Sequence, residues 1–218
     1  MQRRESPIIT YFSIPGPCRK SFFTDPPDSL DTNAFDPGQV YQPAEDTMLL
    51  LGAVLQEIRP YDQVLEIGTG SGVIAAALRK IVRSIVATDI NPHAAVYAWK
   101  QDLTIIITDL LAGIQGSFDL IVFNPPYLPT SPEERIADWL ELALDGGESG
   151  RDVIERFLTD AGRVLAVDGR ILLLISSVTG LSEVIGIAGA HGYGAEIVRE
   201  QVVEDERLYV LRLYRLIK

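Results

Sequence analysis

The stretch FDLIVFNPPYLP, residues 118–129, contains the side chains best suited to aiming a reacting group. A strand-like apolar run ends there on an asparagine, two prolines and a tyrosine, although a simple turn would more often use Asn-Gly or Asp-Gly. Because proline fixes φ, the side-chain carbonyl of Asn124 and the backbone carbonyl of Pro125 would form a rigid pair of acceptors. Such a pair can orient a planar NH2 group, either an amide or an amino-aromatic nitrogen, beside the flat ring of Tyr127. The alternative is a rigid strand exit without a chemical role.

A glycine-rich turn, GTGSG, follows the strand-like segment QVLEI. It places Glu66 just before Gly68, Gly70 and Gly72, and glycines let a ligand approach the backbone closely. In a doubly wound sheet, ligands bind at the carboxyl ends of the strands. Asp89 ends the next strand-like segment 21 residues after Gly68, where a carboxylate can accept both hydroxyls of a ribose. This spacing favours an adenosine cofactor, although the glycines alone would also fit a plain tight turn.

Two details distinguish between adenosine cofactors. A dinucleotide fold expects a third glycine where this chain has Val73, and a pyrophosphate is repelled by a carboxylate such as Glu66. A cofactor with a free ammonium and a sulfonium cation would instead be attracted to that carboxylate. S-adenosylmethionine has both groups, so we expect it as the cofactor.

A third acid, Asp109, follows the strand-like segment LTIII. A side-chain oxygen there can accept a hydrogen bond from the exocyclic amine of an adenine, and Leu110 could cover a face of the ring. The same aspartate would also suit the cap of a turn after the strand. Both interpretations stay open at this point.

The rest of the sequence supplies the elements that would position these residues. Helical spacing begins in AEDTMLLLGAVLQEI, with acids in the first turn, where the helix dipole favours them. Strands are predicted at 63–67, 84–89, 103–107, 118–123 and 169–176, and helices at 73–81, 91–100, 150–165 and 181–192. Two late strands, 195–203 and 206–216, suggest an antiparallel hairpin. The alternation predicts an α/β fold with a doubly wound, Rossmann-like, mostly parallel sheet of seven strands.

Composition limits the kind of protein. Residues 1–39 lack a sustained period and are expected to form a flexible or lid-like extension before one domain, 40–218. The N-terminus has no apolar signal-peptide core, so a cytoplasmic protein is expected. Cys18 is the only cysteine and there are two histidines, so we expect no protein-bound metal. The net charge of −11 disfavours sequence-independent binding of nucleic acid. The longest apolar runs, such as ILLLI at 171–175, are too short to span a bilayer, so no membrane partner is expected.

The combination of EIGTGSG and FNPPYLP resembles class I amino-methyltransferases. More closely, the chain resembles the glutamine-N5 methyltransferases that modify the GGQ loop of class I translation release factors, in their short archaeal and eukaryotic branch. The segments YQPAEDTMLLL, ATDINPHA, ITDLL and LDGGESGRDVIERFL match that branch in order, from about Val40 onward. The NPPY motif alone is less specific, because adenine-N6 DNA methyltransferases share it.

The resemblance implies a role for each matching position. Residues that would contact the S-adenosylmethionine cofactor or lie against it are Thr47, Glu66, Gly68, Thr69, Gly70, Gly72, Asp89, Ile90, Asp109, Leu110 and Asn124. Residues that would hold the substrate amide are Asn124, Pro125, Pro126, Tyr127 and Leu128, of which the first four are the candidate catalytic residues. The glycine-rich loop LDGGESGRD could line a peptide channel or be a flexible connector.

The strand LTIII is expected at the edge of the sheet, with apolar groups on both faces and no charge or proline to block pairing. The resemblance implies a small zinc-binding activator protein that adds a strand to this edge, residues 103–107, to form a heterodimer. The alternative is that helices bury both faces and the N-terminal extension caps the edge.

Three other functions stay open. Methylation of adenine in DNA would use the same geometry, but a DNA enzyme would usually have a basic groove or a target-recognition domain, and the sequence indicates neither. Methylation of a protein lysine would need a base, which the NPPY turn does not offer. A non-catalytic module that kept the cofactor fold would be expected to lose Asn124 or Glu66, and both are present.

Overall fold

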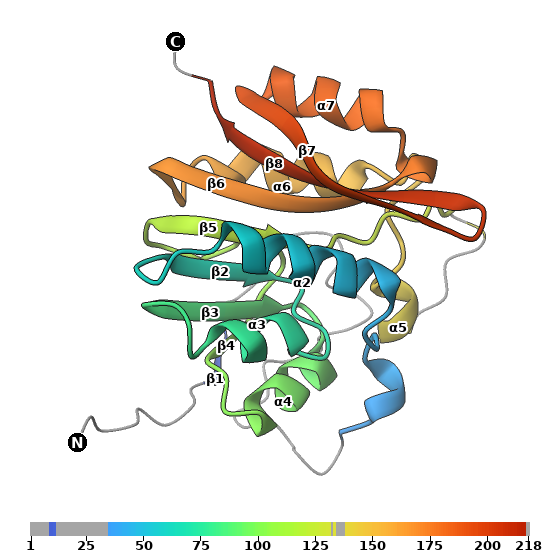
Figure 1. Cartoon of the computed structure of the whole chain (residues 1–218). Helices are drawn as coiled ribbons and strands as arrows, with labels where there is room; N and C mark the ends of the chain where they lie inside the picture. Colours follow the sequence, from blue (N-terminus) through green and yellow to red (C-terminus); the bar gives the residue numbers. More distant parts are fainter. Residues whose placement is uncertain (1–8, 12–34, 132, 134–137, 217–218) are drawn as a thin grey trace.

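Strand and helix alternate along the chain in the computed structural model, which describes residues 9–11, 35–131, 133 and 138–216 (Figure 1). The strands are β1 (Ile9–Tyr11), β2 (Gln63–Ile67), β3 (Ser84–Asp89), β4 (Ile105–Ile107), β5 (Phe118–Phe123), β6 (Leu165–Ser176), β7 (Tyr193–Val203) and β8 (Glu206–Arg215). The helices are α2 (Glu45–Glu57), α3 (Val73–Leu78), α4 (Pro92–Lys100), α5 (Trp139–Leu142), α6 (Asp152–Ala161) and α7 (Leu181–Ala190), with 3-10 turns η1 (Pro37–Gln39) and η2 (Ser177–Thr179).

All described strands belong to one sheet in the order β1-β4-β3-β2-β5-β6-β8-β7. Neighbours are parallel except where β8 pairs with β6 and with β7. Seven of the strands and their mixed pairing were predicted from the sequence, and the prediction is confirmed. The parallel order brings the carboxyl ends of β2, β3, β4 and β5 to one rim of the sheet.

Helices cover both faces of the sheet: α2, α3 and α4 lie in front of it in Figure 1, and α6 and α7 lie behind. Side chains of each strand alternate between the two layers, so Val64 packs in the core under α2, whereas Leu65 and Ile121 pack in the core under α6. Phe157 of α6 contacts Phe123 with ring centroids 4.9 Å apart, and both rings are buried. This contact fixes the end of β5 directly before Asn124.

The segment before the first long helix lies against α4. The ring of Phe35 lies 6.0 Å from that of Tyr97, and the ammonium of Lys100 lies 4.2 Å above the Phe35 ring. The side chain of Asn91 donates to the carbonyl of Gln39 at 2.7 Å. Residues 35–39, which we expected within a flexible or lid-like extension, therefore contact the body of the protein. Residues 1–8 and 12–34 of that extension lie outside the described residues.

Strand β4 is not a free edge of the sheet, contrary to the sequence prediction. Residues Ile9–Tyr11 pair with it in parallel, in the register Ile9↔Ile105 to Tyr11↔Ile107. The expected strand is also shorter than predicted, because pairing is limited to Ile105–Ile107. The physical reason is that unpaired backbone groups at an edge pair with whichever extended segment reaches them. Here that segment belongs to the same chain, as in the alternative that the N-terminal extension caps the edge.

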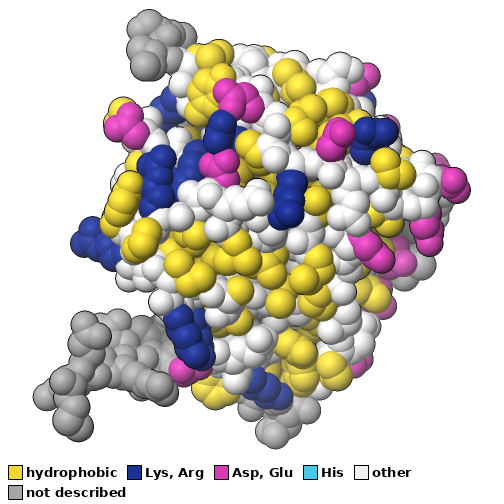
Figure 2. All heavy atoms as spheres, in the orientation of Figure 1, with side chains coloured by type: hydrophobic (Ala, Val, Ile, Leu, Met, Phe, Trp, Pro, Cys, Tyr) yellow, Lys and Arg dark blue, Asp and Glu magenta, His cyan; other side chains and the backbone are white. Residues whose placement is uncertain are grey.

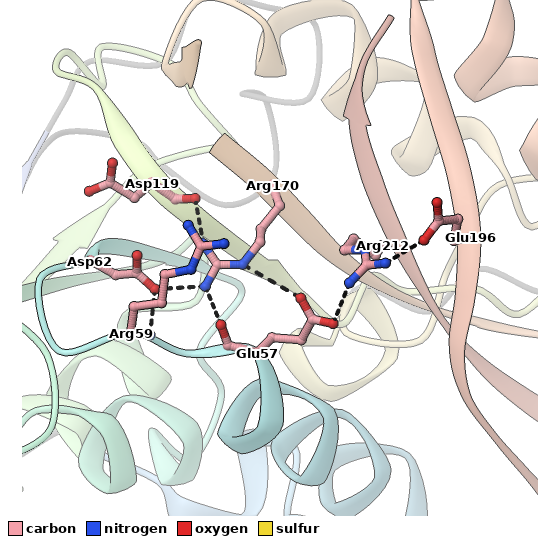
Figure 3. A network of polar contacts seen from close by, with 7 residues as sticks. All are labelled: Glu57, Arg59, Asp62, Asp119, Arg170, Glu196 and Arg212. Carbon is pink, nitrogen blue, oxygen red and sulfur yellow. Dashed lines mark hydrogen bonds and ion pairs between the residues drawn. The ribbon is translucent and has the colours of Figure 1, made fainter. Parts of the chain in front are cut away.

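A network of ion pairs joins α2, β6 and β8 at the end of the sheet opposite the carboxyl rim of the strands (Figure 3). The buried guanidinium of Arg170 lies 2.7 Å from the carboxylate of Asp62, whose side chain is 0% exposed, and 3.6 Å from that of Glu57. Arg212 contacts the other oxygen of Glu57 at 2.8 Å and also pairs with Glu196. The network holds the end of α2 against the sheet and thereby fixes the direction of the helix that reaches the opposite rim.

The face that α2, α3 and α4 cover carries Lys and Arg side chains among acidic and apolar ones, without a continuous basic stripe (Figure 2). No helix within the described part of the chain is long and apolar enough to cross a membrane.

Candidate active site

A cavity of about 190 Å³ opens at the carboxyl ends of β2, β3, β4 and β5. Most of the residues singled out from the sequence line it: Thr47, Glu66, Gly68, Thr69, Gly70, Asp89, Ile90, Asp109, Leu110, Asn124, Pro125, Pro126, Tyr127 and Leu128. Gly72 does not line the cavity. It is buried at the start of α3, where an added Cβ would lie 3.0 Å from Leu103 Cδ1. The parallel sheet thus brings together side chains that are up to 81 positions apart, from Thr47 to Leu128.

Glu66 is the most strongly perturbed acid of the cavity. Its Oε2 accepts from the hydroxyl of Thr69 at 2.8 Å and from the backbone N–H of Ala75 at 3.1 Å. Burial raises the pKa of Glu66 to about 8 in spite of these two donors, which lower it. Among the described residues, no donor reaches Oε1. This oxygen remains for a cation that enters the cavity.

The turn between β2 and α3 bends through glycines in the left-handed region, with φ of 62° at Gly68 and 53° at Gly70. Side chains rarely adopt this conformation, which explains why the turn needs glycine there. The turn points the N–H of Gly70 at Asp89 Oδ2, 2.8 Å away, while Oδ1 accepts from Asn91 N at 2.8 Å. Burial raises the pKa of Asp89 to about 6, and the backbone donors partly offset this. Each oxygen keeps a second lone pair that can accept a hydroxyl.

The amide of Asn124 is held in one orientation by Asp46. Its Nδ2 lies 2.9 Å from Asp46 Oδ2, and a carboxylate can only accept, so the NH2 end of the amide must face Asp46. The other end, Oδ1, is buried, and no group that the structure describes hydrogen-bonds to it. An unpaired buried acceptor costs about 1–3 kcal/mol, so its presence indicates a donor that arrives with a ligand.

Asp46 is a site residue that the sequence analysis missed. It was interpreted as one of the first-turn acids of a helix, which are normally exposed, but its side chain is buried. Its Oδ2 also accepts from the hydroxyl of Tyr41 at 3.1 Å, and its Oδ1 accepts from the hydroxyl of Thr47 at 3.1 Å. Burial, and next the charge of Asp46, raises the pKa of the Tyr41 phenol, which keeps Tyr41 a donor. Both oxygens of Asp46 are therefore occupied by donors.

The residues after Asn124 are fixed by the glycine-rich loop of residues 144–152, which is not a loose connector. Leu128 donates to the carbonyl of Leu144 at 3.0 Å, and its own carbonyl accepts from Gly146 at 2.9 Å. An added Cβ on Gly150 would lie 2.5 Å from the carbonyl oxygen of Tyr127. These contacts hold the half-buried ring of Tyr127 at the cavity, and Leu144 and Asp145 line the cavity beside it.

The cavity residues fit S-adenosylmethionine. The unengaged Oε1 of Glu66 suits an ammonium, Asp89 suits a pair of ribose hydroxyls, and Asp109 with Leu110 suits an adenine edge and face. Leu110 has φ of 50°, a strained value for a residue other than glycine, and such strain is concentrated at functional sites.

Comparison with known proteins agrees with this geometry. Residues 43–139 match the model of the methyltransferase small domain. A putative protein N5-glutamine methyltransferase from Methanocaldococcus jannaschii is 39% identical over 82% of this chain and 93% of its own length. The chain belongs to the protein N5-glutamine methyltransferase family.

Other relatives of the methyltransferase extend the comparison. Methyltransferase HEMK2 from Homo sapiens is 34% identical over 79% of this chain and 88% of its own length. Among solved structures, one chain of the E. cuniculi Mtq2–Trm112 complex superposes on this protein with a TM-score of 0.68. That complex is described as responsible for methylation of the eRF1 translation termination factor. That chain is 33% identical, with 81% of this chain and 99% of that chain covered. The resemblance inferred from the sequence motifs is confirmed.

Proposed function

We propose that this methyltransferase transfers the methyl group of S-adenosylmethionine to the side-chain amide nitrogen of the glutamine in the GGQ motif of a class I translation release factor. The observation that carries the proposal is Asn124 Oδ1, which is buried and has no hydrogen-bond partner among the described residues, while Asp46 accepts from the NH2 end of the same amide. Relatives named for this reaction, including the eRF1 methyltransferase catalytic subunit mtq2 of Schizosaccharomyces pombe, support the choice of substrate.

An amide nitrogen is a poor nucleophile because its lone pair is delocalised into the carbonyl, so it must be aimed. In the proposed mechanism Asn124 Oδ1 and the carbonyl of Pro125 accept the two hydrogens of the amide NH2, which turns the nitrogen lone pair toward the cofactor side of the cavity. The fixed φ of Pro125 and Pro126 keeps this geometry in place before the substrate arrives. When bound, S-adenosylmethionine would supply an electrophilic methyl group on a cationic sulfur: the N–C bond would form as the S–C bond breaks, the sulfur would become a neutral thioether, and the methylated nitrogen would release one of its two protons to water. Glu66 would hold the ammonium of the cofactor.

Both oxygens of Asp46 already accept hydrogen bonds from the protein, which favours an amide substrate over a lysine. A lysine must lose a proton before it attacks, and Asp46 is the carboxylate that hydrogen-bonds to Asn124. Its two oxygens already accept from Asn124, Tyr41 and Thr47. Adenine in DNA has the same planar NH2 geometry, and it remains the second candidate that the assay below must separate.

The test is methyl transfer from labelled cofactor to a purified release factor. Label is expected on the wild-type factor and not on a factor whose GGQ glutamine is replaced, and not on DNA. Asn124→Ala removes one of the two acceptors, and losing one such preorganised interaction typically lowers turnover about 10²- to 10³-fold. Its affinity for cofactor, measured by calorimetry, should stay within about threefold. Normal turnover in Asn124→Ala would show that the aiming mechanism is wrong.

The proposal includes a heterodimer with a small zinc-binding activator protein that adds a strand to residues 103–107. Support comes from the E. cuniculi structure, a complex of Mtq2 with Trm112. In this chain β1 already pairs with that edge, so an added strand must replace it. Three residues of parallel pairing form a short contact that a longer strand can displace.

Deleting residues 1–34 tests this arrangement, because Phe35 and its contacts with α4 remain. Removal of an intramolecular competitor should tighten binding of the activator several-fold, since a tethered strand acts at an effective concentration of about millimolar. Unchanged activator affinity would place the activator at another surface. We further propose that the protein acts in the cytoplasm, where release factors work.

A further inference from the structure

Arg156 of α6 forms an ion pair with Asp109, the acid that follows β4. Its Nη2 lies 2.5 Å from Asp109 Oδ2, and both residues line the cavity. The carboxylate is 18% exposed and the guanidinium side chain 57% exposed, so the arginine lies on the solvent side of the pair. Nothing in the sequence pattern singled out Arg156, because the two residues are 47 positions apart.

The pair leaves the second carboxylate oxygen available. No donor among the described residues hydrogen-bonds to Asp109 Oδ1, whereas Oδ2 is taken by Arg156. The backbone beyond the acid is fixed as well, because Thr108 Oγ1 donates to the carbonyl of Ala112 at 2.7 Å and Leu110 keeps its strained φ of 50°. The carboxylate therefore has one bound oxygen, which sets its rotation, and one oxygen for a ligand.

We propose that Arg156 is a positioning residue that holds Asp109 so that Oδ1 accepts from the 6-amino group of the cofactor's purine, and that it thereby sets selectivity for a 6-amino over a 6-oxo purine. The inference rests on the proposed use of S-adenosylmethionine. A fixed acceptor attracts an amine and repels a carbonyl oxygen, whereas a carboxylate free to rotate can turn toward water and discriminates less.

The test compares binding of S-adenosylhomocysteine with that of its 6-oxo analogue, S-inosylhomocysteine, to the free protein by calorimetry. The wild type should prefer the 6-amino ligand by about tenfold or more, the scale of one hydrogen bond to a charged group. Arg156→Met keeps the aliphatic stem but loses the ion pair, and the preference should fall about three- to fivefold, the scale of a half-exposed pair. Arg156→Lys should restore part of it.

The matched control is Arg207→Met, which removes another half-exposed arginine whose partner is Glu200, at 3.2 Å. Arg207 does not line the cavity, so the ratio of the two affinities should equal that of the wild type. An unchanged ratio of the two ligand affinities in Arg156→Met would overturn the inference. Tighter binding of the 6-amino ligand by this variant would also overturn it, because it would show that Arg156 competes with the ligand for Asp109. Absence of S-adenosylhomocysteine binding to the wild type would instead contradict the proposed cofactor, so the two failures are distinguishable.

Discussion

Replacing Glu66 by glutamine should stabilise the cofactor-free protein while weakening its binding of the cofactor. The carboxyl is 3% exposed, and burial raises its pKa from 4.5 to about 8. Folding therefore makes this group bind a proton that the unfolded chain has released. The contribution of Glu66 to the free energy of unfolding is highest below pH 4.5 and is lost as the pH rises through about 8. Glutamine does not ionise, so it does not lose this contribution as the pH rises. Its Oε1 can still accept hydrogen bonds from Thr69 and Ala75.

Linkage gives the magnitude. With these two pKa values, the proton that Glu66 must bind on folding costs the folded state about 1 kcal/mol at pH 5 and about 3 kcal/mol at pH 7. The free energy of unfolding of Glu66→Gln should thus exceed that of the wild type by a margin that grows by about 2 kcal/mol between these pH values. Burial also raises the pKa of Asp89, to about 6, so its contribution to the free energy of unfolding is lost over a lower pH range than that of Glu66. Because Asp89 is present in both proteins, the difference between their free energies of unfolding reports on Glu66.

The measurement is urea unfolding of both proteins without cofactor at pH 5, 6, 7 and 8, with equal m-values required for the comparison. Glu155→Gln, at an exposed position of α6, is the control and should follow the pH dependence of the wild type. Calorimetry should show that Glu66→Gln binds the cofactor at least about tenfold more weakly, since a charged contact is lost. A constant stability difference from pH 5 to pH 7 would refute the reasoning that Glu66 is a strained, buried acid.

Two further substitutions test the support of the site and of the fold. Asp46→Asn offers both a donor and an acceptor to Asn124, so the amide of Asn124 is no longer forced into one orientation. Turnover should fall about 10- to 100-fold, with cofactor affinity nearly unchanged. A wild-type kcat would refute the role of Asp46. Arg170→Met leaves the fully buried carboxylate of Asp62 without its cation and should lower the free energy of unfolding by about 3–5 kcal/mol in urea denaturation, whereas Arg207→Met should cost less than about 1 kcal/mol. Equal losses in these two variants would contradict the assignment of Arg170 as the centre of a buried network.

The rim of the sheet could be predicted from the sequence because the alternation of strand and helix leaves little choice. Parallel strands joined by helices must end on the same side, so Glu66, Asp89 and Asn124 come together once their strands are recognised. The burial of these strands on both faces is likewise visible as continuous apolar runs, such as the one that ends at Phe123.

Contacts between distant segments could not be predicted in the same way. Asp46 and Asn124 are 78 positions apart, and helical periodicity does not tell whether a first-turn acid faces solvent or the end of a strand. Arg156 and Asp109 pose the same problem. β1 has three residues and no recognisable period, so its pairing with β4 depends only on which extended segment reaches an unpaired edge.

The central claim is that Asn124 presents a fixed oxygen to a planar nitrogen, and a crystal structure with S-adenosylhomocysteine and a peptide containing Gly-Gly-Gln tests it most directly. We expect the glutamine amide nitrogen within about 3 Å of both Asn124 Oδ1 and the Pro125 carbonyl, with the Asp46–Asn124 hydrogen bond intact. A complex in which Asn124 Oδ1 bonds to another protein group, with the glutamine amide held elsewhere, would contradict the account.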